Sequence, residues 1–285
     1  MSRECYIVEK STGEIINEDF IIDETEDIQK KNEILNKRKS DDEFKIFIDQ
    51  NLGNFYFLFY KLIKKGIERQ YIIRFLYLCT YMDYENKLLF GNGLEETKYM
   101  REKDLQEVLK LSKRETSYTR EALIKNELIF IKDNLIEVNK KYCIKGKIES
   151  SKKKSQKVRI FENGLKELYE KAKPKEHKKL ALLIELLPYI NLKFNIVCKN
   201  PTCENIKDLK PIDLKEICKI IKYSPNQSSR LKKDLLSLKV NEELVIMFNE
   251  TGSAKFITIN PKIYYKGTKL DDLKWLINSF EIKSK

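Results

Sequence analysis

The sequence predicts a mainly helical α+β protein in which two helix-turn-helix pairs, each followed by a β-hairpin, succeed one another along the chain. The first pair covers residues 104–124, where a short amphipathic helix precedes a second helix rich in Lys, Arg, Ser and Thr. A near-copy covers residues 213–236, with Asn and Gln added to the second helix. Because single helix pairs of this kind are common in helical proteins, the prediction depends on the repeat and on its matching flanks.

The N-terminal segment, residues 1–43, is predicted to be a small hairpin followed by an acidic, flexible arm. Two short β-branched runs flank a Ser-Thr-Gly turn within residues 5–16, which is the pattern of a hairpin. The following residues are acidic and weakly periodic, apart from residues 27–38, whose pattern fits a helix. Such a segment is typical of an arm that orders on a partner.

Residues 44–146 contain the elements of one winged-helix domain. The expected elements are a helix over Phe55–Ile63 that ends at Gly66, a helix over 68–83, a strand over 87–90, the helix pair at 101–126 and a hairpin over 128–138. Helix, strand, two helices and hairpin is the order of a winged helix, and the hairpin is its wing.

A second winged-helix domain is expected over residues 159–285, after a basic linker at 147–158. The alignment pairs Arg74–Leu78 with Lys179–Leu183, Asn86 with Asn191, Ser112 with Ser224 after a three-residue insertion, and Leu135–Val138 with Phe256–Ile259. This preserved order predicts an internal duplication. The apolar positions of residues 269–280 predict a terminal amphipathic helix, which either docks on its own domain or mediates a homodimer.

The net charge of +12 is unevenly distributed. Residues 1–50 contain 8 basic and 14 acidic side chains, a net charge of −6, which leaves +18 for the remainder. A basic body suggests a polyanionic partner such as double-stranded DNA. The alternative is a Lys-rich proteome in which basic residues are abundant everywhere.

Enzyme, cofactor and membrane classes find little support in the sequence. No Gly-rich phosphate-binding loop is present, and a single histidine, His177, cannot build a histidine-based metal site. No apolar run is long enough to cross a membrane. Cys79, Cys143 and Cys218 have apolar neighbours and are expected as small core residues of a cytoplasmic, reduced protein. We therefore expect a non-enzymatic protein without cofactor or metal.

The second helix of each pair divides into an apolar and a polar face. Inward positions are expected to be Leu123 and Ile124 with Thr116 or Thr119 in the first copy, and Leu231, Leu235 and Leu238 in the second. The candidate DNA-binding residues on the other face are Lys113, Arg114, Ser117, Tyr118 and Arg120 in the first copy, and Asn226, Gln227, Ser229, Arg230 and Lys233 in the second.

Ser112 and Ser224 are expected to cap these helices and to direct their positive ends toward the groove. Asn and Gln side chains pair with adenine, and Arg side chains with guanine. Lys255, in the second wing loop, suits either a minor-groove contact or an ordinary hairpin turn.

Two further motifs resemble the RepL-type replication initiators of Gram-positive plasmids. The stretch from Ile259 to Gly267, INPKIYYKG, is similar to their wing-closing pattern INP-x-x-Y-x-KG, and the earlier copy over 138–146 lacks the Pro. The hairpin from Tyr6 to Ile15 also resembles phage and plasmid proteins of this kind. The resemblance implies origin binding and recruitment of host replication proteins, although the tandem arrangement is more similar to initiators with two winged helices.

The sequence therefore predicts a sequence-specific double-stranded DNA-binding protein, interpreted as a plasmid replication initiator. A transcriptional regulator or a centromere-binding segregation protein is the alternative within the same class. A winged-helix scaffold for protein–protein assembly is the alternative from a different class, and it would show no salt-dependent DNA affinity.

Overall fold

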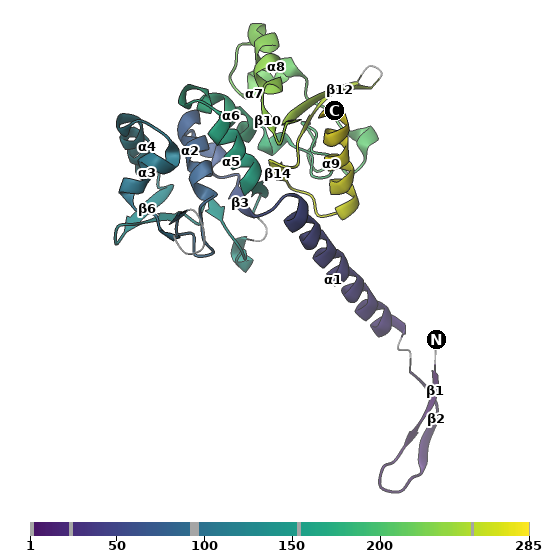
Figure 1. The fold of residues 1–285 in the computed structure, drawn as a ribbon. Helices are drawn as coiled ribbons and strands as arrows, with labels where there is room; N and C mark the ends of the chain where they lie inside the picture. The colour runs from purple at the N-terminus through teal and green to yellow at the C-terminus, as the bar shows by residue number, and fades with distance from the viewer. Residues whose placement is uncertain (1–2, 23–24, 92–96, 153–154, 252–253, 285) are drawn as a thin grey trace. The chain divides into compact units, whose positions relative to one another are not determined.

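The computed structural model describes residues 3–22, 25–91, 97–152, 155–251 and 254–284, and it combines α-helices with small antiparallel β-sheets (Figure 1). The chain divides into two compact units, residues 1–48 and 49–285.

The N-terminal unit consists of a β-hairpin and most of a long helix. Strands β1 (Arg3–Val8) and β2 (Ile15–Ile22) pair antiparallel, which confirms the predicted hairpin and lengthens its second strand. Gly13 closes the turn with a positive φ of 75°, a conformation that glycine adopts without strain. Helix α1 (Thr25–Asn51) is more than twice as long as the predicted helix at 27–38. No Gly or Pro interrupts it, so the backbone can stay helical although its apolar positions show little periodicity.

The larger unit contains the remaining elements. Its first half contains β3 (Phe55–Phe59), α2 (Arg69–Cys79), β4 (Leu89–Phe90), β5 (Lys98–Tyr99), α3 (Leu105–Leu109), α4 (Lys113–Lys125), β6 (Ile129–Lys132), β7 (Leu135–Val138) and β8 (Cys143–Ile144). Its second half contains β9 (Lys157–Phe161), α5 (Glu162–Lys171), α6 (His177–Glu185), α7 (Leu214–Ile220), α8 (Ser228–Leu236), β10 (Lys239–Val240), β11 (Glu243–Leu244), β12 (Ile246–Thr251), β13 (Ala254–Ile259), β14 (Tyr264–Tyr265) and α9 (Leu270–Ser284).

A four-stranded antiparallel sheet joins the two halves. Its strand order is β14-β9-β3-β8, so each half contributes its first and its last strand. The first strands, β3 and β9, form the central pair, and α2 packs against α6 beside them (Figure 1). One hydrophobic core contains residues of both halves. The halves predicted as separate domains at 44–146 and 159–285 therefore share a sheet and a core.

The hydrogen-bonding registers of the two halves correspond residue by residue. Phe57 pairs with Ile144 in the first half, and Arg159 pairs with Tyr265 in the second. Equivalent positions are thus 102 residues apart in the first strands and 121 apart in the last strands. In the central pair, Phe57 of β3 lies opposite Arg159 of β9, which is also its equivalent 102 residues later. The sheet therefore has an approximate twofold relation through this pair.

A buried asparagine closes the first half. Asn86 is fully buried and has a φ of 71°. Its side-chain amide donates to the carbonyls of Val138 at 3.3 Å and Cys143 at 2.8 Å, and the Val138 amide donates to the Asn86 carbonyl at 2.8 Å. These bonds tie the end of β7 to the start of β8.

The second half repeats this arrangement with Asn195. Its amide donates to the carbonyls of Ile259 at 3.2 Å and Tyr264 at 3.0 Å, which lie 121 residues after the partners of the first half. The alignment of Asn86 with Asn191 is therefore wrong. Asn191 instead donates to Pro201 and Cys203 in a neighbouring loop. The loop between the helix and the closing asparagine is longer in the second half, after α6, than in the first half, after α2. An alignment that keeps the shorter spacing therefore pairs Asn86 with Asn191.

The predicted helix over Phe55–Ile63 is also wrong, because Phe55–Phe59 form strand β3. A short apolar run fits a buried strand as well as a helix, and its length favours the strand. This run is buried between β8 and β9 and bonded to both, which its sequence alone does not reveal.

The predicted linker and terminal helix are partly changed in the structure. Residues 157–158 of the linker belong to β9, and 153–154 lie outside the described residues. The terminal helix α9 buries Leu273, Leu276 and Phe280 within the larger unit, which is the docked alternative of the two predicted for it.

Removing either closing asparagine should destabilise the larger unit. Asn86→Ala and Asn195→Ala each leave two buried carbonyls unpaired, so each should lower the free energy of unfolding by about 2 kcal/mol. Urea unfolding followed by circular dichroism measures this. Asn278→Ala, at an exposed position of α9, is the control and should change stability by less than about 0.5 kcal/mol. A change in the free energy of unfolding below about 0.5 kcal/mol for either buried asparagine would contradict its role in pairing the two carbonyls.

Candidate nucleic-acid interface

The first candidate recognition helix, α4, is anchored through its apolar face. The Ser112 hydroxyl accepts the Glu115 amide at 3.3 Å, which confirms Ser112 as the N-cap. Thr119 and Leu123 are fully buried, as predicted. Ile124 is 39% exposed, which contradicts its predicted inward position. Adjacent helical residues point about 100° apart, and on α4 the direction that buries Leu123 turns Ile124 toward solvent.

The outward face of α4 presents four of its five predicted residues to solvent. Lys113, Arg114, Ser117 and Tyr118 are exposed. The Arg114 Nε donates to the Tyr118 hydroxyl at 3.0 Å, and its guanidinium lies 5.4 Å from the ring centroid. This contact holds an arginine and a tyrosine together on one exposed face.

Arg120 has a different position from the other four. It is half-buried, and its Nη1 pairs with Glu102 at 2.5 Å. Arg120 therefore links α4 to the turn before α3, and it does not belong to the freely exposed surface predicted for it.

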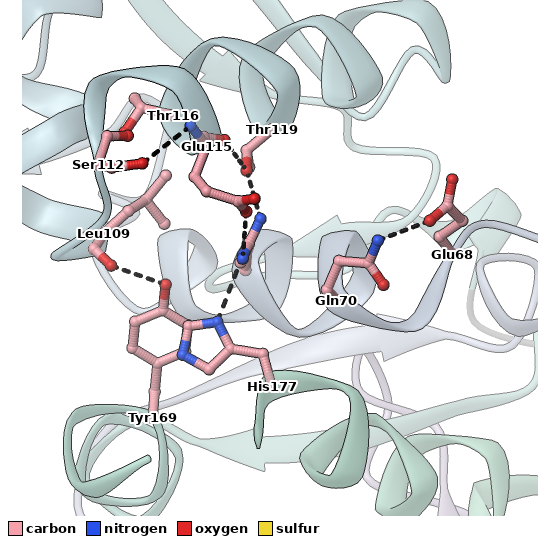
Figure 2. A network of polar contacts seen from close by, with 10 residues as sticks. Glu68, Gln70, Leu109, Ser112, Glu115, Thr116, Thr119, Tyr169 and His177 are labelled. Atoms are coloured by element: carbon pink, nitrogen blue, oxygen red, sulfur yellow. Dashed lines mark hydrogen bonds and ion pairs between the residues drawn. The ribbon is translucent and has the colours of Figure 1, made fainter. Parts of the chain in front are cut away.

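A buried arginine positions α4 from behind. Arg74 on α2 is 2% exposed, and its Nη2 pairs with the Glu115 carboxylate at 2.9 Å. Its Nη1 donates to the Thr119 hydroxyl at 2.8 Å, and its Nε donates to His177 Nδ1 at 3.3 Å. Figure 2 shows this network between α2, α4 and α6. This network was not predicted from the sequence, although Arg74 stands out as a charged residue within an otherwise apolar stretch of helix.

Aromatic stacking extends this network into the second half. The Tyr169 ring stacks on Tyr77 with centroids 3.8 Å apart and on His177 at 4.3 Å. The Tyr169 hydroxyl donates to the Leu109 carbonyl at 2.9 Å, at the end of α3 (Figure 2). Residues of α5 and α6 therefore support the helix-turn-helix of the other half.

The second candidate recognition helix begins differently from the first. Residues Pro225–Gln227 form a 3-10 turn ahead of α8, and Ser224 makes no side-chain capping bond. Its predicted capping role is wrong, because the Gln227 amide donates to the Ser224 carbonyl at 2.9 Å, the bond that a 3-10 turn requires. Leu231 and Leu235 are buried as predicted, and Leu238 is half-buried.

The outward face of α8 carries three of the five predicted residues, and the 3-10 turn before it carries the other two, Asn226 and Gln227. The five are Asn226, Gln227, Ser229, Arg230 and Lys233, and each is exposed. Within the described part of the chain, none of these side chains has a hydrogen-bond or ion-pair partner. Their donors, acceptors and positive charges are therefore available to a ligand.

The two hairpins predicted to be wings differ in length. Strands β6 and β7 are joined by Asp133 and Asn134, both with positive φ, as a two-residue hairpin turn requires. Strands β12 and β13 are longer, and the tip at 252–253 lies outside the described residues. Lys255 is exposed at the start of β13 and pairs with Glu250 across the hairpin at 3.3 Å.

No family model, curated protein or solved structure matches the chain significantly. Among the described residues, no three His, Cys, Asp or Glu side chains are grouped to hold a metal ion. No helix in the described ranges is both long and apolar enough to span a membrane.

His177 should titrate far below an ordinary histidine. Burial, followed by the neighbouring Arg74 guanidinium, lowers the pKa of His177 from 6.5 to about 4. Because it is the only histidine of the chain, its ring proton resonances need no assignment, and an NMR titration should show a midpoint near 4. A midpoint near 6.5 would contradict the buried, neutral ring.

The same shift predicts a pH dependence of stability. As pH falls from 6.5 toward 4, the unfolded chain binds the proton before the folded protein does, so the free energy of unfolding decreases over this window. The loss from this group should reach up to about 3 kcal/mol. Urea unfolding at pH 7 and pH 4.5 should therefore show a smaller difference for His177→Gln than for the wild type.

Proposed function

We propose that this protein binds double-stranded DNA in a sequence-specific manner through α4 and α8. The observation that carries the proposal is the group of exposed polar side chains at Asn226, Gln227, Ser229, Arg230 and Lys233, which have no hydrogen-bond or ion-pair partner among the described residues, while the apolar face of α8 is buried. Two other polar residues of α8 do have contacts, since Asp234 pairs with Lys179 and Lys232 lies over the Phe248 ring. A helix that reads a major groove needs this division between an anchored face and donors free to meet base edges. The similar division of α4 supports a second reading helix.

We propose further that each half of the larger unit is a winged helix and that the two arose by internal duplication. Each half contains a helix pair followed by a hairpin, which is the order of a winged helix. The matching registers at the first and last strands, and the paired roles of Asn86 and Asn195, support the duplication.

The two helices would read different subsites. Arg114 and Arg230 can pair bidentately with guanine, whereas Asn226 and Gln227 can pair with adenine. The adenine-reading pair has no counterpart at the start of α4, which presents Lys113 and Arg114 instead. We therefore expect a two-part site whose elements differ in sequence.

For the biological role, we favour initiation of plasmid replication, on the resemblance of INPKIYYKG and the N-terminal hairpin to RepL-type proteins. Host replication proteins would then be partners, with the acidic N-terminal residues as a surface for them, and the protein would act in the cytoplasm. A transcriptional regulator or a segregation protein would bind DNA by the same chemistry. The scaffold alternative differs because it requires no DNA contact.

Selection from a pool of random duplexes tests DNA recognition. At about 0.15 M salt, the retained duplexes should share a two-part motif with elements about one helical turn apart. A match between this motif and the origin of the chain's own replicon would favour an initiator over a regulator. Retained duplexes without a shared motif would contradict sequence-specific reading.

Arginine substitutions on the two helices test the assignment of residues. Arg114→Ala and Arg230→Ala should each weaken binding to the selected duplex by about 1–3 kcal/mol and relax specificity at one position. Arg38→Ala, an exposed arginine of α1, removes the same charge and should leave affinity unchanged. Equal affinities for all variants would contradict the assignment of Arg114 and Arg230 to the DNA interface.

A further inference from the structure

Two adjoining hollows at one end of the central sheet are lined by cations. They have volumes of about 280 and 300 Å³ and share Ser155. The first contains Lys157, Arg159 and Lys266, and the second contains Lys61, Lys140, Lys141 and Lys152. No carboxylate is among the described residues that line either hollow. These seven cations define the basic groove.

At the opposite end of the sheet, the lysine equivalent to Lys266 forms an ion pair with a carboxylate. Lys145 lies 121 residues before Lys266, and its Nζ pairs with the Glu162 carboxylate at 2.7 Å. In the basic groove the position equivalent to Glu162, 102 residues earlier, is Tyr60. Lys266 Nζ accordingly lies 4.9 Å from the Tyr60 ring centroid. An aromatic ring orients a cation but leaves its net charge in place.

A second equivalent pair shows the same difference. Lys262 pairs with Glu243 at 2.6 Å, with little exposure of either side chain. Its equivalent in the basic groove, 121 residues earlier, is Lys141, which lies 5.6 Å from the Tyr142 ring centroid. At both equivalent pairs the ends of the sheet differ in the same way, since Lys145 and Lys262 meet carboxylates whereas Lys266 and Lys141 meet rings. Another lysine of the basic groove, Lys152, pairs with Glu149 at 3.3 Å.

Arg159 and Lys266, the cations of the basic groove closest to the approximate twofold axis, are partly buried. The Arg159 guanidinium lies 5.7 and 5.8 Å from the ring centroids of Phe55 and Phe57, and it donates to the Gly267 carbonyl at 2.9 Å. Burial lowers the pKa of Arg159, and burial together with nearby Lys157 lowers the pKa of Lys266. Bringing these charges together is unfavourable in the free protein, and a bound anion would relieve the repulsion.

We propose that the basic groove binds the phosphodiester backbone of duplex DNA, an inference that rests on the proposed function. The charges extend over two adjoining hollows, which fits a row of phosphates better than one small anion. Single-stranded nucleic acid is less suited to the groove, because it needs free aromatic faces on which bases can stack. Here the Tyr60 ring beside Lys266 is only 5% exposed, and the half-buried Phe57 ring, which lines the first hollow, lies against the Arg159 guanidinium.

The salt dependence of binding to a labelled 40-base-pair duplex of mixed sequence tests this proposal. Each lost phosphate contact should reduce the slope of log affinity against log salt by about 0.9. Lys141→Gln/Lys266→Gln should therefore reduce the slope by about 2 and weaken binding on the order of tenfold at 0.15 M salt. Fluorescence anisotropy measures both quantities.

The matched control is Lys87→Gln/Lys171→Gln, which removes two lysines that pair with Glu85 and Glu167 outside the basic groove. It should keep the wild-type slope. Because Lys266 is partly buried, Lys61→Gln/Lys140→Gln provides a second groove variant at two exposed positions, and it should reduce the slope similarly.

The outcomes separate this proposal from the proposed function. If both groove variants keep the control's slope while Arg114→Ala and Arg230→Ala still weaken binding to the selected duplex, the groove proposal alone is overturned. If the wild-type protein binds no duplex, both fail. If the groove substitutions weaken binding of a 40-nucleotide single strand but not of the duplex, the assignment to duplex DNA is overturned.

Discussion

The antiparallel pairing of β3 with β9 is the constraint on which the larger unit depends. It places the first strands of both halves side by side, at the centre of a sheet whose outer strands are the last strands of those halves. Around this pair α2 packs against α6, and Arg74, Tyr169 and His177 tie α3 and α4 of one half to α5 and α6 of the other. The two candidate recognition helices therefore belong to one packed body and are not carried on independent domains.

An approximately symmetric sheet has asymmetric surfaces. Lys145 and Lys262 meet carboxylates at one end, whereas Lys266 and Lys141 meet aromatic rings at the other. The two candidate recognition helices differ as well, since α4 starts at a serine cap and α8 follows a 3-10 turn. Buried contacts such as those of Asn86 and Asn195 are thus alike in the two halves, whereas the charged surfaces and the two candidate recognition helices differ.

Local features of the sequence predicted both helix pairs, both hairpins and the outward residues of α8, because turn residues and helical periodicity are short-range signals. Features that depend on contacts between the halves could not be predicted in this way. The apolar spacing of Phe55–Phe59 also fits a helix, and only the pairing of this segment with β8 and β9 shows that it is a strand. The partners of Arg74 lie 41 to 103 residues further along the chain. The role of Tyr60 follows only from its spatial equivalence to Glu162.

The most direct test of a rigid pair of recognition helices changes the spacing within the selected DNA site. One or five base pairs would be inserted between its two elements, and the affinity of the wild-type protein would be compared with that for the original duplex. Because five base pairs move the second element to the opposite face of the helix, rigid coupling predicts a loss of affinity of at least about tenfold. Equal affinity for all three spacings would contradict the account, because it would show that the two helices bind DNA independently.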